Sequence, residues 1–299
     1  MNLSRQRQGE LIIFVEVTLW SLFPIITVLS YKNISPLFSL TISSFLAACF
    51  FAVFITKRKL WSEVTNRAAF KNILFATLFL GIGYYLLIFL GLQYTTPGNA
   101  SIIGLTQGFF SFLFFHVLRK EYIPKAHIWG GFFMVCGALI ILASNFHTFK
   151  FGDFLILLAN AISPFGNFYA QKARKQVSSE TIMFVRSSIS ATVIFLLAIT
   201  LKSPISLQAV QGSLWFLLIN GFILLGLSKI LWIEGIHRIS VTKALGLGSI
   251  EPLFTLTFAY LLLQQIPTVW QLVSIFPIII GIFLLSKQGI KQQITPVED

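Results

Sequence analysis

Ten long apolar blocks follow one another along the 299-residue chain, and they limit the possible fold more than any other feature. Each block holds about 18–23 residues, so a helix rising about 1.5 Å per residue would cross about 30 Å of hydrocarbon. Only 11% of the residues are charged, about half the share typical of soluble domains. The sequence therefore predicts an all-α membrane protein with ten transmembrane helices. The predicted spans are approximately 11–30, 37–56, 73–93, 99–118, 127–144, 153–172, 181–201, 214–236, 242–263 and 269–286.

The positive charges are distributed unevenly between the two sets of loops that ten spans create. Of the 22 Lys and Arg residues, 17 fall in the termini and loops of one side and three in the loops of the other side. The remaining two, Arg186 and Lys229, lie inside predicted spans. The positive-inside rule makes the richer side cytoplasmic, so we expect both termini in the cytoplasm. The net charge of +12 follows from this bias and does not indicate a nucleic-acid partner. The first block lacks a small-residue cleavage site and is interpreted as a retained helix.

The two halves of the sequence resemble each other at an offset of 143–144 residues. Residues 90–115 align with 234–259, and residues 9–21 align with 152–164. Each half then holds five spans, and because five is odd, the second half enters the membrane from the opposite side. This pattern predicts two inverted five-helix repeats, an architecture that places transport sites between the halves. The predicted repeats are residues 1–147 and 148–299.

Glu251 is a carboxylate in the middle of an apolar span. It lies about 9 residues, or about 13 Å, into that span, which is close to the midplane. It shares one helical face with small and polar side chains, and the following Pro252 interrupts the helical hydrogen bonds. Gln107 holds the same place in the first half. We expect Glu251 to line a central cavity or to handle protons there; the alternative is a structural cap on a neighbouring backbone break.

Three other charged residues lie within predicted spans. Lys229 is about 11 Å from the end of its span, deep enough to bind a substrate anion, although a stretched lysine reaching the interface is the alternative. Arg186 is shallower and would anchor its span or pair with Glu16 or Glu234. Glu16 shares a helical face with Trp20, a combination suited to amines.

Several uncharged polar and aromatic residues could also line a cavity, although each is typical of an interfacial belt or an interhelical hydrogen bond. We expect Pro24, Pro164 and Pro252 to mark flexible points. Glu10 and Asp153 are interpreted as solvated or helix-start charges. The substrate-binding candidates are Lys229, Glu251, Glu16, Trp20, Tyr85, Gln107, Asn160, Asn167, Arg186 and Trp232.

The chain resembles the drug/metabolite transporter superfamily, in its ten-helix EamA-type branch, over nearly its whole length. The matching stretches are Trp20-Ser-Leu-Phe-Pro24, Gly91-Leu-Gln-Tyr-Thr-Thr-Pro-Gly-Asn-Ala100, Glu121 and Ile250-Glu-Pro252. The resemblance implies a bacterial inner-membrane carrier whose cavity is walled by helices 1–4 and 6–9, with helices 5 and 10 at the periphery. The chain departs from the family pattern at Ser163, Ser43-Ser44, Gln265 and Lys229.

These features predict a secondary transporter, an exporter or exchanger of small organic metabolites that are amino-acid-like or bear a carboxylate. We expect it to work by alternating access as a monomer or a weak homodimer in the lipid bilayer. Proton coupling through Glu251 or Glu16 stays open beside facilitated diffusion. The alternative is a membrane-embedded enzyme or lipid-handling protein, but no catalytic motif is present, and we expect no cofactor or metal.

Overall fold

The computed structural model describes residues 4–119, 125–143, 150–239 and 241–286, and every regular element in these ranges is a helix. Glu121 and the predicted repeat boundary between residues 147 and 148 lie outside them. The helices group into ten runs plus one short connecting helix, α4 (Trp61–Val64). The first five runs are α1 (Arg5–Trp20) with α2 (Phe23–Ser30), α3 (Pro36–Lys57), α5 (Arg67–Ala76) with η1 (Thr77–Tyr84) and α6 (Tyr85–Gly91), α7 (Pro97–Gly104) with α8 (Gln107–Arg119), and α9 (Lys125–Ala143). The second five are α10 (Phe151–Ala173), α11 (Ser179–Thr200), α12 (Leu207–Leu218) with η2 (Ile219–Leu227) and α13 (Ser228–Ile236), α14 (Val241–Gly248) with α15 (Glu251–Leu263), and α16 (Val269–Ser286).

Several helices begin where a hydroxyl residue precedes the first turn. The side chain of Ser35 accepts a hydrogen bond from Phe38 N, and the following Pro36 opens α3. Thr96 accepts one from Asn99 N in the same way, and Pro97 opens α7. The hydroxyl satisfies an amide that has no partner within the helix, and proline is favoured at the first helical position. These pairs define where two spans begin.

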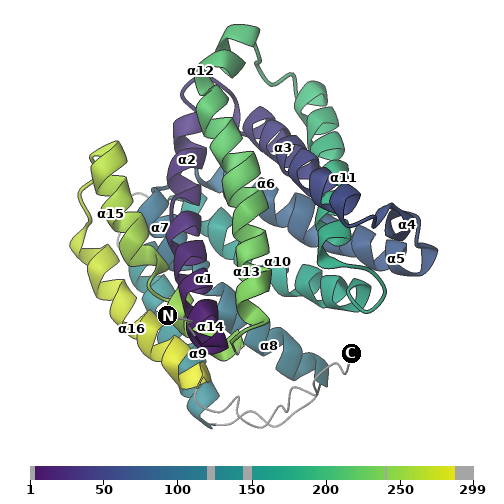
Figure 1. Ribbon diagram of the computed structural model, residues 1–299. Coiled ribbons are helices and arrows are strands. Elements are labelled where there is room, and N and C mark those ends of the chain that lie inside the picture. The colour runs from purple at the N-terminus through teal and green to yellow at the C-terminus, as the bar shows by residue number, and fades with distance from the viewer. Residues whose placement is uncertain (1–3, 120–124, 144–149, 240, 287–299) are drawn as a thin grey trace.

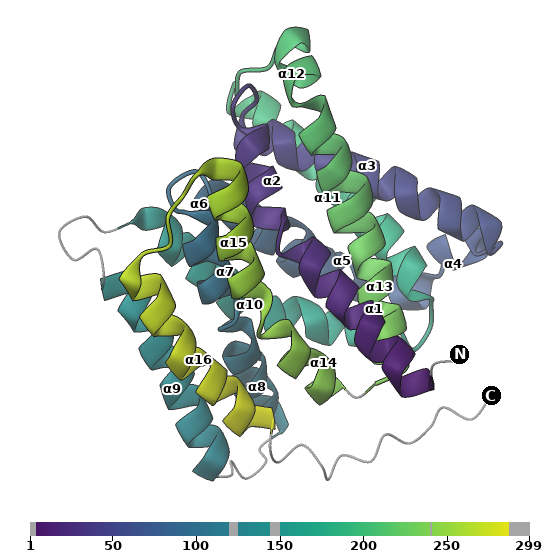
Figure 2. The ribbon, with the colours of Figure 1, turned by 60° about the vertical axis from the view of Figure 1, so that its left-hand side comes forward.

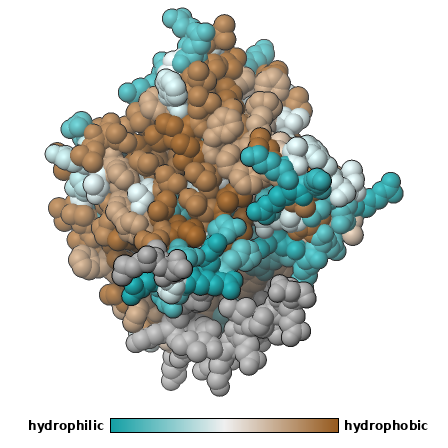
Figure 3. Space-filling view, viewed as in Figure 1, coloured by the Kyte–Doolittle hydropathy of each residue, from teal (hydrophilic) through white to brown (hydrophobic). Residues whose placement is uncertain are grey.

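The surface of the molecule is suited to lipid. Among the described residues, seven helical runs are long and apolar enough to cross a membrane, and two shorter apolar helices cover Ile128–Leu142 and Val269–Leu284. The remaining run, α10, has 23 residues and carries more polar side chains. Figure 3 shows hydrophobic side chains over the middle of one face, with hydrophilic ones gathered at its upper tip, right edge and lower part. The ten-helix membrane fold predicted from the apolar blocks is confirmed.

The helix pairs of the two halves mirror one another. Helix α1 packs on α13, and its counterpart α10 packs on α5, η1 and α6. Helix α3 packs on its equivalent α11, and α9 on its equivalent α16, while α7 packs on α15, which joins the equivalent fourth and ninth runs (Figures 1 and 2). The mirroring extends to single glycines. A Cβ on Gly91 would lie 2.9 Å from Ile156 Cδ1, and one on the equivalent Gly235 would lie 2.6 Å from Cγ1 of the equivalent Ile13. The inverted five-helix repeat is confirmed.

The peripheral pair α9 and α16 depends on two glycines that let the backbones approach closely. A Cβ on Gly137 would lie 2.9 Å from Ser274 O, and one on Gly281 would lie 2.6 Å from Gly130 O. Because both obstacles are backbone atoms, Gly281→Leu must push the helices apart. We expect it to lower stability by about 1–3 kcal/mol in thermal unfolding of the purified protein. Gly246→Leu is the control, since no described heavy atom lies within 4 Å of a Cβ there. Equal unfolding temperatures would contradict this packing.

Three of the runs are broken near their middle. The chain leaves regular helix at Ser21-Leu22 between α1 and α2, at Leu105-Thr106 between α7 and α8, and at Ser249-Ile250 between α14 and α15. The last two breaks are equivalent in the repeat, so Gln107 and Glu251 each begin the second half of a broken helix. The flexible points expected at Pro24 and Pro252 lie beside breaks, whereas α10 continues through Pro164.

Two π-helical segments, η1 and η2, occupy equivalent places in the third and eighth runs. Each packs a glycine against a helix of the other half: Gly81 of η1 lies against α11, and Gly221 of η2 lies against α3. Since α3 and α11 are themselves equivalent, the two contacts mirror each other. A π-helix inserts extra backbone into a helix and is frequent at functional sites. These segments therefore direct attention to the centre of the molecule.

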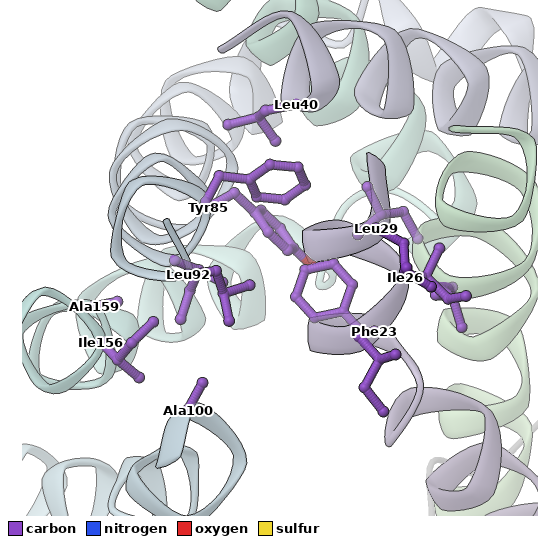
Figure 4. Close-up of a cluster of buried hydrophobic side chains, with 14 of the residues drawn as sticks. Phe23, Ile26, Leu29, Leu40, Tyr85, Leu92, Ala100, Ile156 and Ala159 are labelled. Atoms are coloured by element: carbon purple, nitrogen blue, oxygen red, sulfur yellow. The ribbon is translucent and has the colours of Figure 1, made fainter. Parts of the chain in front are cut away.

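The largest apolar core lies between the two halves (Figure 4). Phe23 of α2 and Tyr85 of α6 point toward each other there, with ring centroids 6.2 Å apart in an edge-to-face arrangement. Leu92, Ala100 and Ile156 extend the core toward α7 and α10. This core forms one wall of the cavity described below.

A polar cluster joins α4 to the start of α11. Ser178 N, Ser178 Oγ and Thr181 Oγ1 each donate a hydrogen bond of 2.6–2.7 Å to the Glu63 carboxylate. Partial burial acts to raise the pKa of Glu63, but the hydrogen bonds outweigh it and the pKa is lowered. The carboxylate thus stabilises the fold above its ordinary pKa, and this contribution is lost as pH falls through the lowered value.

Glu63→Gln is therefore expected to lower the unfolding temperature near neutral pH, and this difference should shrink as pH falls through the lowered pKa of Glu63. Thermal unfolding of both proteins across this range measures the difference. A difference that does not shrink on acidification would show that the charge of Glu63 plays no part.

Candidate functional site

A cavity of about 70 Å³ lies where the three broken runs meet. Trp20 and Pro24 come from the first break, Gly104 and Gln107 from the second, and Glu251 from the third. The space is enough for a few water molecules, whereas small-molecule pockets usually measure about 300–1,000 Å³. The remaining lining residues are Phe23, Tyr84, Ile88, Leu92, Ala100 and Ser101.

Trp20 is held between a ring and a cation. Its indole stacks on Phe23, with ring centroids 4.5 Å apart and planes at 4°. The Lys229 ammonium lies over the same indole, with Nζ 3.1 Å from the ring centroid. An ammonium over an indole face is favourable by up to about 2 kcal/mol when water is excluded. Trp20 lines the cavity and Lys229 does not, so the ammonium lies next to the cavity only through its contact with the Trp20 ring.

Two carboxylates lie around this lysine. Ser228 Oγ donates a hydrogen bond of 2.9 Å to Glu16 Oε1, and both groups are buried. Glu251 is the first residue of α15, where the partial positive charge of a helix N-terminus favours a carboxylate. Both acids are close enough to Lys229 to interact electrostatically. No ion pair shorter than 4.0 Å joins Lys229 to either acid among the residues described.

The breaks in the helices are braced by side chains. Thr255 Oγ1 donates 3.0 Å to Ser21 O, the carbonyl at the break between α1 and α2. Asn160 Nδ2 donates 2.8 Å to Ile156 O and 3.4 Å to Ile103 O, so this predicted site residue is engaged with backbone carbonyls and does not line the cavity. The bonds to Ser21 O and Ile103 O supply donors to carbonyls next to two of the breaks, where the regular helical hydrogen bonds stop.

Arg186 and Tyr85 lie at a second, smaller space. This chamber measures about 10 Å³ and is separate from the central cavity. Tyr85 forms the partition, because its ring meets Tyr84 at 5.1 Å, and Tyr84 faces the central cavity. Of the predicted site residues, Trp20, Gln107 and Glu251 line the central cavity, and Tyr85 and Arg186 line this chamber.

Two further candidates lie away from both spaces. Trp232 packs beside the small core of Ile13, Val17 and Ile239, on the α1 side of α13. Asn167 lies partly buried in the second half of α10 and is not among the residues that line either space.

The structure adds residues that the sequence did not single out. Phe23 and Ser101 line the cavity, and Ser228 holds Glu16. The signal available for Ser228 was a hydroxyl next to Lys229 in an apolar span. Of the two interpretations of Asp153, a solvated charge is wrong, because it is buried and accepts hydrogen bonds from Thr95 and Asn99, whereas a helix-start charge is confirmed, because it lies in the first turn of α10.

The site offers an aromatic face, an amide, and charges of both signs. Such groups can bind and orient a polar molecule that carries a cation and an anion. The cavity must widen before it can hold a whole metabolite, since its volume is far below that of ordinary ligand pockets.

Comparisons with known proteins agree with this architecture. The model of the EamA-like transporter family matches the chain twice, over residues 7–143 and 150–287. The uncharacterized transporter YoaV of Bacillus subtilis (strain 168) is 22% identical over 280 residues, covering 90% of this chain and 94% of that protein. The uncharacterized transporter YyaM of the same strain is 23% identical over 214 residues, covering 68% and 69%. A solved crystal structure has the same fold, with a TM-score of 0.67, 18% identity, and coverage of 93% of this chain and 96% of its own.

Proposed function

The chain belongs to the EamA-like transporter family, and we propose that it exports or exchanges a small amino-acid-like metabolite by alternating access. The substrate carries a carboxylate and enters the central cavity between the two halves. It binds against Trp20 and Gln107, with its charged groups near Lys229 and Glu251. This proposal rests on one observation above the others: a lysine held on an indole between two acids, at the wall of the cavity.

The position of Lys229 suits a cation that moves when substrate binds. Its ammonium lies on the Trp20 ring without a carboxylate within 4.0 Å among the described residues. A substrate carboxylate can therefore attract it without first breaking a buried ion pair, which would cost several kcal/mol. A substrate amine can approach Glu251, which already faces the cavity. The result is recognition of both ends of a zwitterion.

Equivalent contacts at the two ends of the molecule support alternating access. Lys243 of α14 forms an ion pair with Glu10 of α1. At the equivalent places in the other half, Asn99 of α7 donates a 3.1 Å hydrogen bond to Asp153 of α10. Both contacts are closed here, which agrees with the small volume of the cavity. Opening one while keeping the other would expose the cavity to one side at a time, as inverted repeats allow.

The transporter is a multi-pass membrane protein, and we propose that it lies in a bacterial inner membrane with both termini in the cytoplasm. The 17-to-3 distribution of positive charges between the two sets of loops supports this orientation. Reporter fusions that place the two termini on opposite sides would overturn it.

Proton coupling is proposed to act through Glu251, the one acid that lines the central cavity in the described structure. Glu251→Gln removes a group that can gain and lose a proton but keeps its size. We expect this variant to transport with a flattened dependence on pH. Uptake into proteoliposomes at several pH values measures this, and an unchanged pH profile would show that Glu251 is not the group that carries the proton.

The substrate class is tested by comparing metabolites inside and outside cells that lack or overproduce the protein, using mass spectrometry. The expected result is a shift of amino-acid-like compounds toward the medium on overproduction. Candidates are then confirmed by transport into proteoliposomes. A shift confined to compounds without a carboxylate would overturn the proposed substrate class.

A further inference from the structure

Arg186 is a buried cation that the proposed transport mechanism does not use. It lies on α11 and is 9% exposed. Among the described residues, no carboxylate lies within 4.0 Å of its guanidinium. Lys229 is close enough to interact with it electrostatically, and it carries a charge of the same sign. A buried guanidinium without a counter-charge costs several kcal/mol, so its surroundings must supply one.

The chamber next to Arg186 is built from small and hydroxyl-bearing residues. Ser190 Oγ is buried and has no hydrogen-bond partner in the structure. Gly81 of η1 leaves the space open, because a Cβ there would lie 2.8 Å from Arg186 Cγ and even closer to Ser190 Oγ. The other lining residues are Ser44, Tyr85, Ser187 and Leu225.

The chamber also lies on the axis that relates the two halves. Ser44 and Ser187 are equivalent residues of α3 and α11, and Gly81 and Leu225 are equivalent residues of η1 and η2. Only the second half supplies a charge, since the residue equivalent to Arg186 is Ser43. The chamber is therefore lined by a single guanidinium, that of Arg186, although residues from both halves surround it.

The volume of the chamber limits the size of the ligand that it can hold. About 10 Å³ corresponds to a single water-sized position, too little for a carboxylate or a phosphate with several heavy atoms. Serine and tyrosine hydroxyls can all turn their hydrogens toward an anion, as the guanidinium does. We propose that the Arg186 chamber binds a single monatomic anion, chloride, which neutralises the guanidinium between the two halves. This site is independent of the metabolite that the transporter carries.

The test measures chloride binding by the purified protein without any transport substrate. Sodium gluconate is replaced by sodium chloride at constant ionic strength, and the unfolding temperature is followed. Wild type is expected to show a saturable rise, because a ligand that binds only the folded state stabilises it. Arg186→Gln should lose this rise, and Ser190→Ala should raise the apparent Kd for chloride severalfold.

Matched controls separate the site from general salt effects. Arg58→Gln removes a cation that pairs with Glu180 at the surface, and Ser188→Ala removes a hydroxyl bonded to Phe184 O on the same helix. Both should keep the chloride response of wild type. Crystals grown with bromide give a second readout that does not depend on any variant folding: an anomalous peak beside Arg186. Unfolding temperatures equal in chloride and gluconate, no bromide peak, or a full response in Arg186→Gln would each overturn the proposal.

Discussion

Lys229→Gln is expected to fold and insert normally but to lose most of its affinity for acidic and zwitterionic metabolites. Glutamine is similar in length and polar, but it cannot make a charge-assisted hydrogen bond to a carboxylate. Such a bond contributes about 1.5–3 kcal/mol, so Kd should rise roughly tenfold to a hundredfold. Ligand binding to the purified protein and uptake into proteoliposomes measure the loss, and size-exclusion chromatography checks folding.

Lys172 provides the matched control for this experiment. Its Nζ also lies over an aromatic ring, 4.2 Å from the Phe168 centroid, but at the exposed end of α10. Lys172→Gln removes the same charge and the same kind of ring contact outside the cavity, so it should transport normally. If Lys229→Gln transports its substrate with wild-type rate and affinity, Lys229 takes no part in binding the substrate and the proposed recognition is wrong.

The depth of Lys229 could be predicted from the sequence, but its partner could not. Counting residues from the end of a span gives depth directly, because a helix rises by a fixed amount per residue. Which helix faces the lysine depends on how ten helices pack. The sequence contains two tryptophans, Trp20 and Trp232, that are both candidates for the site. Trp20 lies under the ammonium, whereas Trp232 packs against the small core that includes Ile13. Which tryptophan contacts Lys229 is therefore decided by tertiary packing.

The fold itself was predictable because the membrane imposes it. Blocks of fixed length and the 143–144-residue repeat were enough for ten helices in two inverted halves. The breaks were harder to predict, because Leu105-Thr106 contains no proline. The repeat carries that information, since Gln107 is equivalent to Glu251, which precedes Pro252. Asn160 shows the opposite case: a polar residue in a span that is engaged in holding backbone carbonyls.

Gly104→Leu is expected to abolish transport without lowering stability. Gly104 lines the central cavity, and no described heavy atom lies within 4 Å of a Cβ built on it. Its backbone is helical, with no positive φ, so a leucine fits there without strain. The side chain must therefore extend into a space of only about 70 Å³ and exclude the substrate. Replacing a helical glycine should even add a few tenths to about 1 kcal/mol of stability.

Gly246→Leu is the control for this experiment, because a Cβ there also meets no described atom within 4 Å, but on an exposed position of α14 away from the cavity. Transport into proteoliposomes and thermal unfolding are measured for both variants. Stable protein without transport from Gly104→Leu, beside normal transport from Gly246→Leu, would identify the cavity between the three helix breaks as the substrate path. Full transport by Gly104→Leu would show that the substrate crosses elsewhere, because a side chain that occupies a cavity of this size leaves no room for a metabolite to pass through it.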